Sequence, residues 1–169
     1  MSLVIVDYTP SWVVRFNDER TALLSALGSC EFAIEHIGST AVPGLAAKPS
    51  IDVMLGASSL ERIEEVIAPL ASLGFQYMPG HEKKIPERRL FAKPAEHPRS
   101  VNLHGVVRNG RLWRDQLAFR DALRSDSSLA RTYEVLKRSL AAAHPEDRAA
   151  YTEGKSNFVR TILAQRREA

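Results

Sequence analysis

The sequence has one cysteine, Cys30, in 169 residues. A single thiol excludes an intrachain disulfide and a metal site built from several cysteines. No apolar run is long enough to span a bilayer, and no charged segment with a long apolar stretch opens the chain. Aromatic residues are scarce, and the most basic region, 81–99, contains only Phe91, so stacking of nucleic-acid bases is not expected. We therefore predict a cytoplasmic protein whose partner is neither a membrane nor a nucleic acid.

Neither sign of charge dominates the chain. It has 23 Lys and Arg against 20 Asp and Glu, a formal net charge of +3, and the basic residues are scattered. This balance permits an anionic ligand without requiring one. Because 44% of the residues are hydrophobic and no repeat or low-complexity linker interrupts them, we expect residues 1–169 to form a single domain with a sizeable core.

Apolar periodicity divides the chain into a mixed first half and a helical second half. Thr9 and Pro10 are typical of a helix start, with Thr9 as the cap and Pro10 as the first helical residue. The predicted elements are a helix over 11–27, strands over 31–37 and 50–56, a helix over 59–73, a strand from 75, a hairpin of 88–93 and 100–107, and helices near 111–125, 127–143 and 147–166. This order indicates an α+β fold rather than a doubly wound one.

The most informative stretch lies between the first two predicted strands. Gly38 and Ser39 follow the first strand, a turn of small residues comes next, and the second strand carries one acid, Asp52. Glycine lets the backbone approach a phosphate closely, and free N–H groups at a helix start attract anions. A carboxylate on the neighbouring strand can hold the Mg²⁺ that accompanies the phosphate. The alternative is a plain turn in which Ser39 or Thr40 caps a helix.

Several motifs, taken in order, resemble those of the GrpB family, whose members look like minimal nucleotidyltransferase-fold proteins. The matching segments cover nearly the whole chain and are YTPSW (8–12), HIGSTAVPG (36–44), KPSID (48–52), NLH (102–104), FRD (119–121) and YTEGK (151–155). The resemblance implies a nucleotidyltransferase-like fold, in which helices pack on a mixed β-sheet and the C-terminal half is helical. It also implies a nucleotide or another phosphate-bearing small molecule as the ligand.

Met54 departs from the pattern of active nucleotidyltransferases. It shares a strand face with Asp52, where those enzymes normally place a second metal-binding acid. A thioether is a poor ligand for Mg²⁺, and two-metal transfer needs several carboxylates. The strand 100–107 offers Asn102 and His104 instead of a third acid. We therefore expect weak or undetectable Mg²⁺-dependent transfer, with phosphate binding retained, and leave open whether Mg²⁺ or another divalent metal binds.

His36, Asp52 and His104 form a second candidate site, catalytic or metal-binding. If their three strands are neighbours, two imidazoles and a carboxylate converge in one cleft. That donor set suits Zn²⁺, Mn²⁺ or Fe²⁺ better than Mg²⁺, and it could instead bind phosphate or relay a proton. The alternative is that both histidines are structural and are satisfied by backbone groups.

Basic side chains add candidate ligands for the phosphate. The predicted phosphate-binding residues are Gly38, Ser39, Thr40, Lys48, Arg120 and Lys155. Lys155 lies on the apolar stripe of the last predicted helix, and Lys137 is placed similarly on the helix before it. The simpler interpretation is that each buries its stem and extends its ammonium group to solvent, although the family motif at 151–155 favours a cleft position for Lys155. For Arg120 the alternative is an ion pair with Asp121 on a helix surface.

Three functional hypotheses stay open at this point. The first is a divergent nucleotidyltransferase that moves a nucleotidyl group to an unknown acceptor. The second is a non-catalytic module that binds a nucleotide or another anion and regulates a partner, such as an enzyme of coenzyme A metabolism. The third is a metal-dependent hydrolase that uses His36, Asp52 and His104.

Overall fold

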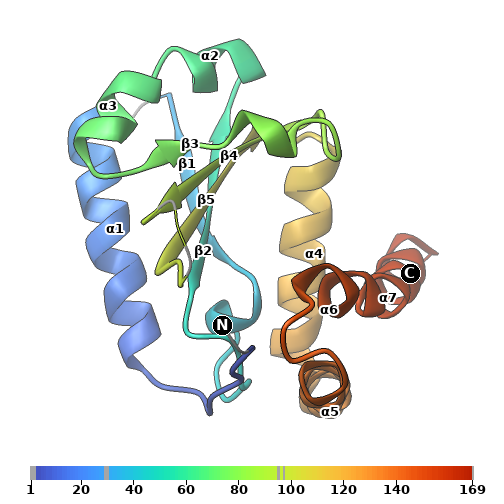
Figure 1. Cartoon of the computed structure of the whole chain (residues 1–169). Helices are drawn as coiled ribbons and strands as arrows, with labels where there is room; N and C mark the ends of the chain where they lie inside the picture. The colour runs from blue at the N-terminus through green and yellow to red at the C-terminus, as the bar shows by residue number, and fades with distance from the viewer. Residues whose placement is uncertain (1–2, 29–30, 95, 97, 169) are drawn as a thin grey trace.

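A mixed five-stranded β-sheet lies at the centre of the protein (Figure 1). The computed structural model describes residues 3–28, 31–94, 96 and 98–168, so Cys30 lies outside the described residues. The strands are β1 (Ala33–Ile37), β2 (Ile51–Ala57), β3 (Gln76–Tyr77), β4 (Arg88–Lys93) and β5 (Val101–Val107), in the order β1-β2-β5-β4-β3. β2 and β5 are parallel and the other neighbouring pairs are antiparallel, which confirms the predicted mixed sheet.

Helices cover both faces of this sheet, so β2 is buried on both sides (Figure 1). One face packs against α1 (Ser11–Leu27), α2 (Leu60–Glu64) and α3 (Ile67–Ser72), and the alternate residues Ile51, Val53 and Leu55 point into that core. Met54 points to the opposite face and packs against Trp113 of α4 (Arg111–Ser125). The period of two along a strand therefore assigns Asp52, two residues before Met54, to the α4 side.

The C-terminal half is helical, as predicted. α5 (Ser127–Ala143), α6 (Arg148–Gly154) and α7 (Ser156–Glu168) follow α4 and lie beside it, on the side of the sheet away from α1 (Figure 1). Asp126 caps α5 by accepting hydrogen bonds from the N–H groups of Ser128 and Leu129, at 2.9 and 3.0 Å. In the described part of the chain, no helix combines the length and the apolar character needed to cross a membrane.

Two of the predicted helices are broken in the structure. The range 59–73 divides into α2 and α3 because Pro69 has no N–H to donate to the carbonyl of Glu65, and its ring clashes with that carbonyl in a continuous helix. The range 147–166 divides at Lys155, between α6 and α7.

Candidate functional site

The turn after β1 lies directly beside the acid on β2. β1 ends at Ile37, which is opposite Asp52 in the antiparallel register, and Gly38 leads into a short 3-10 helix, η1 (Ser39–Ala41). Gly38 has φ 72° and ψ −175°, a conformation that essentially only glycine adopts. A Cβ atom at Gly38 would lie 2.6 Å from Oδ2 of Asp52. Glycine is therefore needed both for the backbone conformation and for the close approach to Asp52.

Asp52 is held by side chains of β5. Its Oδ1 accepts a hydrogen bond from Nδ2 of Asn102 at 3.0 Å, and Nε2 of His104 lies 3.4 Å from the same oxygen. On the other side of the imidazole, Nδ1 lies 3.4 Å from Nη1 of Arg88. Because a guanidinium can only donate, Nδ1 of His104 is the acceptor and Nε2–H is the group that donates to Asp52.

The Asp52 carboxylate is ionised. Burial by itself raises the pKa of Asp52, but the hydrogen bonds from His104 and Asn102 and the nearby charge of Lys48 outweigh burial and hold the pKa below its usual value. Asp52 therefore places a fixed negative charge in the site.

His36 does not join Asp52 and His104. It is opposite Val53 in the register, so it points to the α1 face of the sheet, where its ring stacks on Phe16 with centroids 4.6 Å apart. Burial, with a smaller effect from Arg124, lowers the pKa of His36 to about 4, so the imidazole is neutral at pH 7.

The predicted metal cluster of His36, Asp52 and His104 is therefore wrong. Successive side chains of a strand point to opposite faces, and it is Ile37 rather than His36 that shares the face of Asp52. Nε2 of His36 instead lies 3.0 Å from Oγ1 of Thr40 and fixes the turn. Among the residues that the structure describes, no three His, Cys, Asp or Glu side chains are grouped to hold a metal. The hydrolase hypothesis loses its basis.

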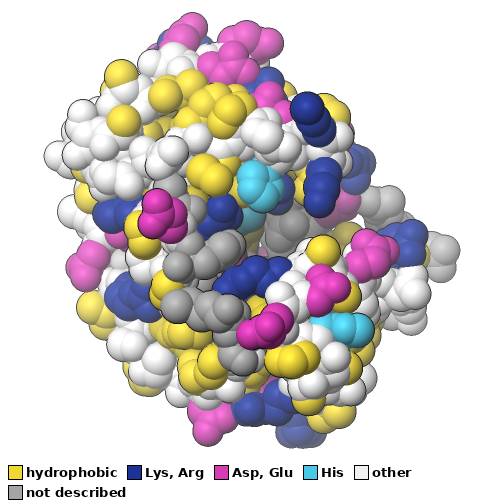
Figure 2. Space-filling model, viewed as in Figure 1, with side chains coloured by type: hydrophobic (Ala, Val, Ile, Leu, Met, Phe, Trp, Pro, Cys, Tyr) yellow, Lys and Arg dark blue, Asp and Glu magenta, His cyan; other side chains and the backbone are white. Residues whose placement is uncertain are grey.

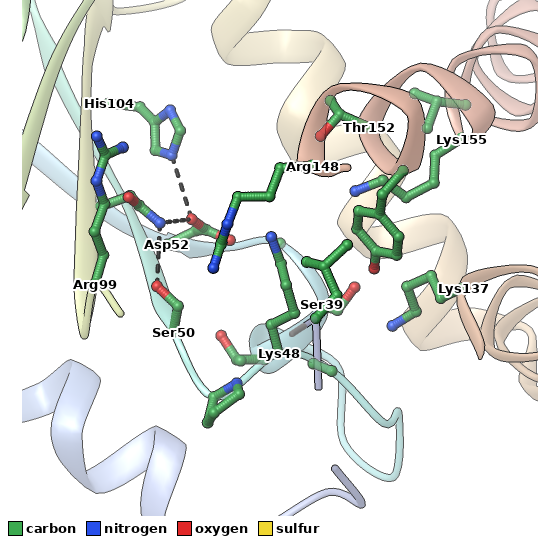
Figure 3. A pocket seen from close by; sticks show the side chains of 18 of the residues that line it. Ser39, Lys48, Ser50, Asp52, Arg99, His104, Lys137, Arg148, Thr152 and Lys155 are labelled. Atoms are coloured by element: carbon green, nitrogen blue, oxygen red, sulfur yellow. Dashed lines mark hydrogen bonds and ion pairs between the residues drawn. The ribbon is translucent and has the colours of Figure 1, made fainter. Parts of the chain in front are cut away.

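A cavity of about 740 Å³ opens between the sheet and the C-terminal helices. Lys and Arg side chains surround a hollow on this side of the molecule (Figure 2), and the close view shows them converging from several elements (Figure 3). The basic residues of its described lining are Lys48, Arg99, Lys137, Arg148 and Lys155, and the acidic ones are Asp52 and Asp115. Gly38, Ser39 and Thr40 also line the cavity. The hollow thus has an excess of positive charge.

Lys48 and Lys155 share one aromatic ring. Their ammonium nitrogens lie 5.2 and 4.3 Å from the centroid of Tyr151, the tyrosine of α6. Burial and, to a smaller extent, the charge of Lys48 lower the pKa of Lys155 to about 8, against the raising effect of Asp52. Burial also lowers the pKa of Lys48, against the raising effect of Asp52. Lys155, between α6 and α7, therefore faces the cavity, the position that its family motif favoured.

Lys137 is the most deeply buried of these lysines. Its side chain on α5 is 2% exposed, and its ammonium group donates a hydrogen bond to the carbonyl of Ala46 and lies 5.0 Å from the centroid of Tyr133. Burial, followed by the charge of Lys155, lowers the pKa of Lys137 to about 7. The interpretation that Lys137 extends its ammonium group to solvent is wrong, because α5 packs that face against the loop that carries Ala46.

Arg120 is structural rather than a phosphate ligand. Its Nη1 donates to Oε2 of Glu35 at 2.8 Å and to the carbonyl of His36 at 3.0 Å, and its Nε donates to Oδ1 of Asp121 at 2.8 Å. The first two bonds fasten α4 to β1, and Arg120 lies outside the described lining of the cavity. The predicted contact of Arg120 with a phosphate is wrong, and the ion pair with Asp121 is the correct alternative.

Sequence reasoning missed Arg148 and Tyr133 as lining residues, whereas Arg99 belongs to the basic region 81–99 that the sequence had marked. Arg148 is the first residue of α6, and its guanidinium is directed into the cavity from the side opposite the sheet (Figure 3). No motif marks it, since its position depends on how α6 packs on α5. Tyr133 carried a readable signal, because it lies one turn before Lys137 on the same apolar stripe of α5.

The donors around Asp52 do not fit a pair of Mg²⁺ ions. Two-metal sites are built from several carboxylates, whereas Asp52 has an amide, Asn102, and an imidazole, His104, as its neighbours on β5. Met54 is fully buried against Ile37, Val106 and Trp113 and is not among the described lining residues. Asp52 therefore has no second carboxylate beside it on β2 or β5.

Comparison with known proteins identifies the family. The model of the GrpB protein family matches residues 2–165 of this chain. The UPF0157 protein PA4798 of Pseudomonas aeruginosa is 40% identical over 159 residues, which cover 92% of this chain. The match spans 64% of that relative's length. A dephospho-CoA kinase of Mycolicibacterium paratuberculosis is 26% identical over 179 residues, which cover 92% of this chain and 44% of the kinase.

Solved structures agree with this assignment. The crystal structure of the conserved protein GrpB from Enterococcus faecalis has a TM-score of 0.84 and 34% identity, with 96% of each chain covered. A structure of the Cid1 poly(U) polymerase has a TM-score of 0.54 at 14% identity and covers 89% of this chain and 49% of that one, a likeness of fold alone. The chain therefore belongs to the GrpB family and has the fold of the nucleotidyltransferase-like superfamily.

Proposed function

We propose that this protein binds a phosphate-bearing small molecule, with a nucleotide as the first candidate, in the cavity between the sheet and the C-terminal helices. The observation that carries the proposal is the gathering of five Lys and Arg side chains around one cavity whose described lining has two carboxylates. Like charges repel one another in a partly buried space, and burial of each ammonium group costs free energy. A multiply charged anion relieves both costs at once.

The chemistry of the lining favours phosphate over a single carboxylate. Lys48 and Lys155 approach from different elements and lie near the ring of Tyr151, and each is within the electrostatic influence of Asp52. Because an ammonium group has three N–H donors, each lysine can still donate to a ligand. A phosphate chain has enough oxygens for several such donors, and charge-assisted hydrogen bonds are the strong ones. The volume of about 740 Å³ is within the range of small-molecule sites. The choice of a nucleotide rests on the superfamily alone.

Transfer of a nucleotidyl group is not part of this proposal. The carboxylates that fix two metal ions in such a reaction have no counterpart beside Asp52. The properties of the site favour the hypothesis of a binding module that acts on a partner. The similarity to a longer protein named dephospho-CoA kinase makes an enzyme of coenzyme A metabolism one such candidate partner.

Isothermal titration with ATP and with pyrophosphate, each in EDTA, tests the proposal. We expect saturable binding of one molecule per chain, and a loss of about 10- to 100-fold in affinity in the Lys155→Met variant, which removes one charge-assisted contact of about 1.5–3 kcal/mol. Lys84→Met is the matched control, because Lys84 is an exposed lysine outside the described lining. If neither ATP nor pyrophosphate binds, the proposal is wrong.

The Lys137→Met variant should change the pH dependence of stability as well as the affinity for ATP. In the native protein Lys137 titrates near pH 7, whereas in the unfolded chain it titrates at its usual, higher pKa. Between these values the unfolded state binds the extra proton, so this lysine makes stability rise with pH, by up to about 1.4 kcal/mol per pH unit. We expect denaturant unfolding to show a smaller rise from pH 7 to pH 9 in Lys137→Met, greater stability than wild type at pH 6, and weaker ATP binding. An unchanged pH dependence would contradict this.

A further inference from the structure

We infer that the cavity binds the metal-free form of its phosphate-bearing ligand. Lys48 and Arg148 occupy the position beside Asp52 that a divalent metal ion would need. This inference rests on the proposed function and adds the chemical form of the ligand. Its consequence is that Mg²⁺, which chelates a polyphosphate, should weaken binding rather than strengthen it.

The first support is that one oxygen of Asp52 is already engaged and that no second carboxylate lies beside it on β2 or β5. Oδ1 is shared by Asn102 and His104, at 3.0 and 3.4 Å. Oδ2 faces Gly38, where an added Cβ atom would lie 2.6 Å away. A Mg²⁺ ion at Oδ1 would have to displace the bonds from Asn102 and His104, and it would find no second carboxylate beside Asp52 on β2 or β5.

The second support is the charge around Asp52. Lys48 and Asp52 shift each other's pKa in the directions expected of an attractive pair. Arg148 lies close enough to lower the pKa of Lys48, and Figure 3 shows both basic side chains extending toward Asp52. The carboxylate is therefore already compensated by fixed cations. A divalent ion there would be repelled by an ammonium and a guanidinium group in a confined space.

The third support is where the other acids lie. Asp115, the second acid of the described lining, has its Oδ2 3.7 Å from Nη1 of Arg111. Glu35, which shares the sheet face of Met54, is bound to Arg120 at 2.8 Å. Asp115 and Glu35 are thus each paired with an arginine of α4, so neither is a free carboxylate for a metal ion.

The test compares the affinity for ATP in EDTA with the affinity in excess Mg²⁺ at matched ionic strength. We expect at least 10-fold weaker binding in Mg²⁺, because the chelated ligand has lost charge and brings a cation with it. Inorganic phosphate, which binds Mg²⁺ far more weakly than ATP does, should show little change and serves as the internal control. Equal or tighter binding of ATP in Mg²⁺ would overturn the inference while leaving the proposed function intact.

The Lys48→Met variant adds a second measurement. Removal of this ammonium group should weaken ATP binding in EDTA and reduce the difference between the two conditions, because less repulsion opposes the metal. Lys84→Met should keep the full difference. If Lys48→Met binds ATP in EDTA as wild type does, Lys48 does not hold the ligand and the inference is wrong. If neither phosphate nor ATP binds wild type in either condition, the proposed function itself fails.

Discussion

Replacing Gly38 with alanine is expected to destabilise the protein and abolish phosphate binding together. The backbone at φ 72° and ψ −175° costs a residue with a side chain about 1–3 kcal/mol. The new methyl group would also lie 2.6 Å from Oδ2 and 3.2 Å from Cβ of Asp52. Asp52 cannot move freely, because Asn102 bonds to it from β5. The turn must therefore shift away from the cavity that it lines, and denaturant unfolding with ATP titration measures both effects.

Gly44→Ala is the matched control for the cost of placing alanine at a positive φ. Gly44 also has a positive φ, 79°, but nothing lies within 4 Å of a Cβ added there. This variant should lose stability through backbone strain alone and keep most of its affinity for ATP. Wild-type affinity in Gly38→Ala would show that the close approach to Asp52 has no part in binding.

The face of each residue in β2 could be predicted from sequence, but the partner of each could not. Alternation assigns Asp52 and Met54 to one face and Val53 to the other, as the structure shows. Whether His36 or Ile37 shares the face of Asp52 depends on the register between β1 and β2. A slip of one residue exchanges the two, and register is set by the burial of both faces rather than by any local signal. The erroneous metal cluster has this origin.

The cationic cavity shows a second limit of sequence reasoning. The apolar stripe of α5 marks Lys137 as lying on the packed face of its helix. The stripe does not reveal whether that face borders solvent or an enclosed hollow, because the hollow forms only when α5, α6 and the loop before β2 meet. By contrast, the break between α2 and α3 could have been predicted, since Pro69 fits the first turn of α3 but not the interior of one helix over 59–73. Features set by neighbouring residues could be predicted here, whereas a cavity formed by segments that are distant in the sequence could not.

Met54→Asp is expected to lower the free energy of unfolding rather than create a metal site. The substitution would place an acid where active nucleotidyltransferases have one. Met54 is 0% exposed and packs against Ile37, Val106 and Trp113. A carboxylate without a partner in such surroundings costs about 3–5 kcal/mol. Met54→Leu keeps the volume and should cost less than about 1.5 kcal/mol, which makes it the control for lost packing.

The pH dependence of Met54→Asp identifies the cause of that loss. Burial raises the pKa of an aspartate, so the native state of the variant keeps a proton that the unfolded state releases above its usual pKa of about 4. The stability deficit relative to Met54→Leu should therefore grow as the pH rises from 4 to 8. A deficit that shrinks over this range, or Mg²⁺ that stabilises Met54→Asp but not wild type, would show that the position opens to the cavity. The closeness of α4 argues against that outcome, because a Cβ atom at Gly56, two residues along β2, would lie 2.4 Å from the ring of Trp113. The helix that covers this end of the strand fills the space that the second acid of a metal site would require.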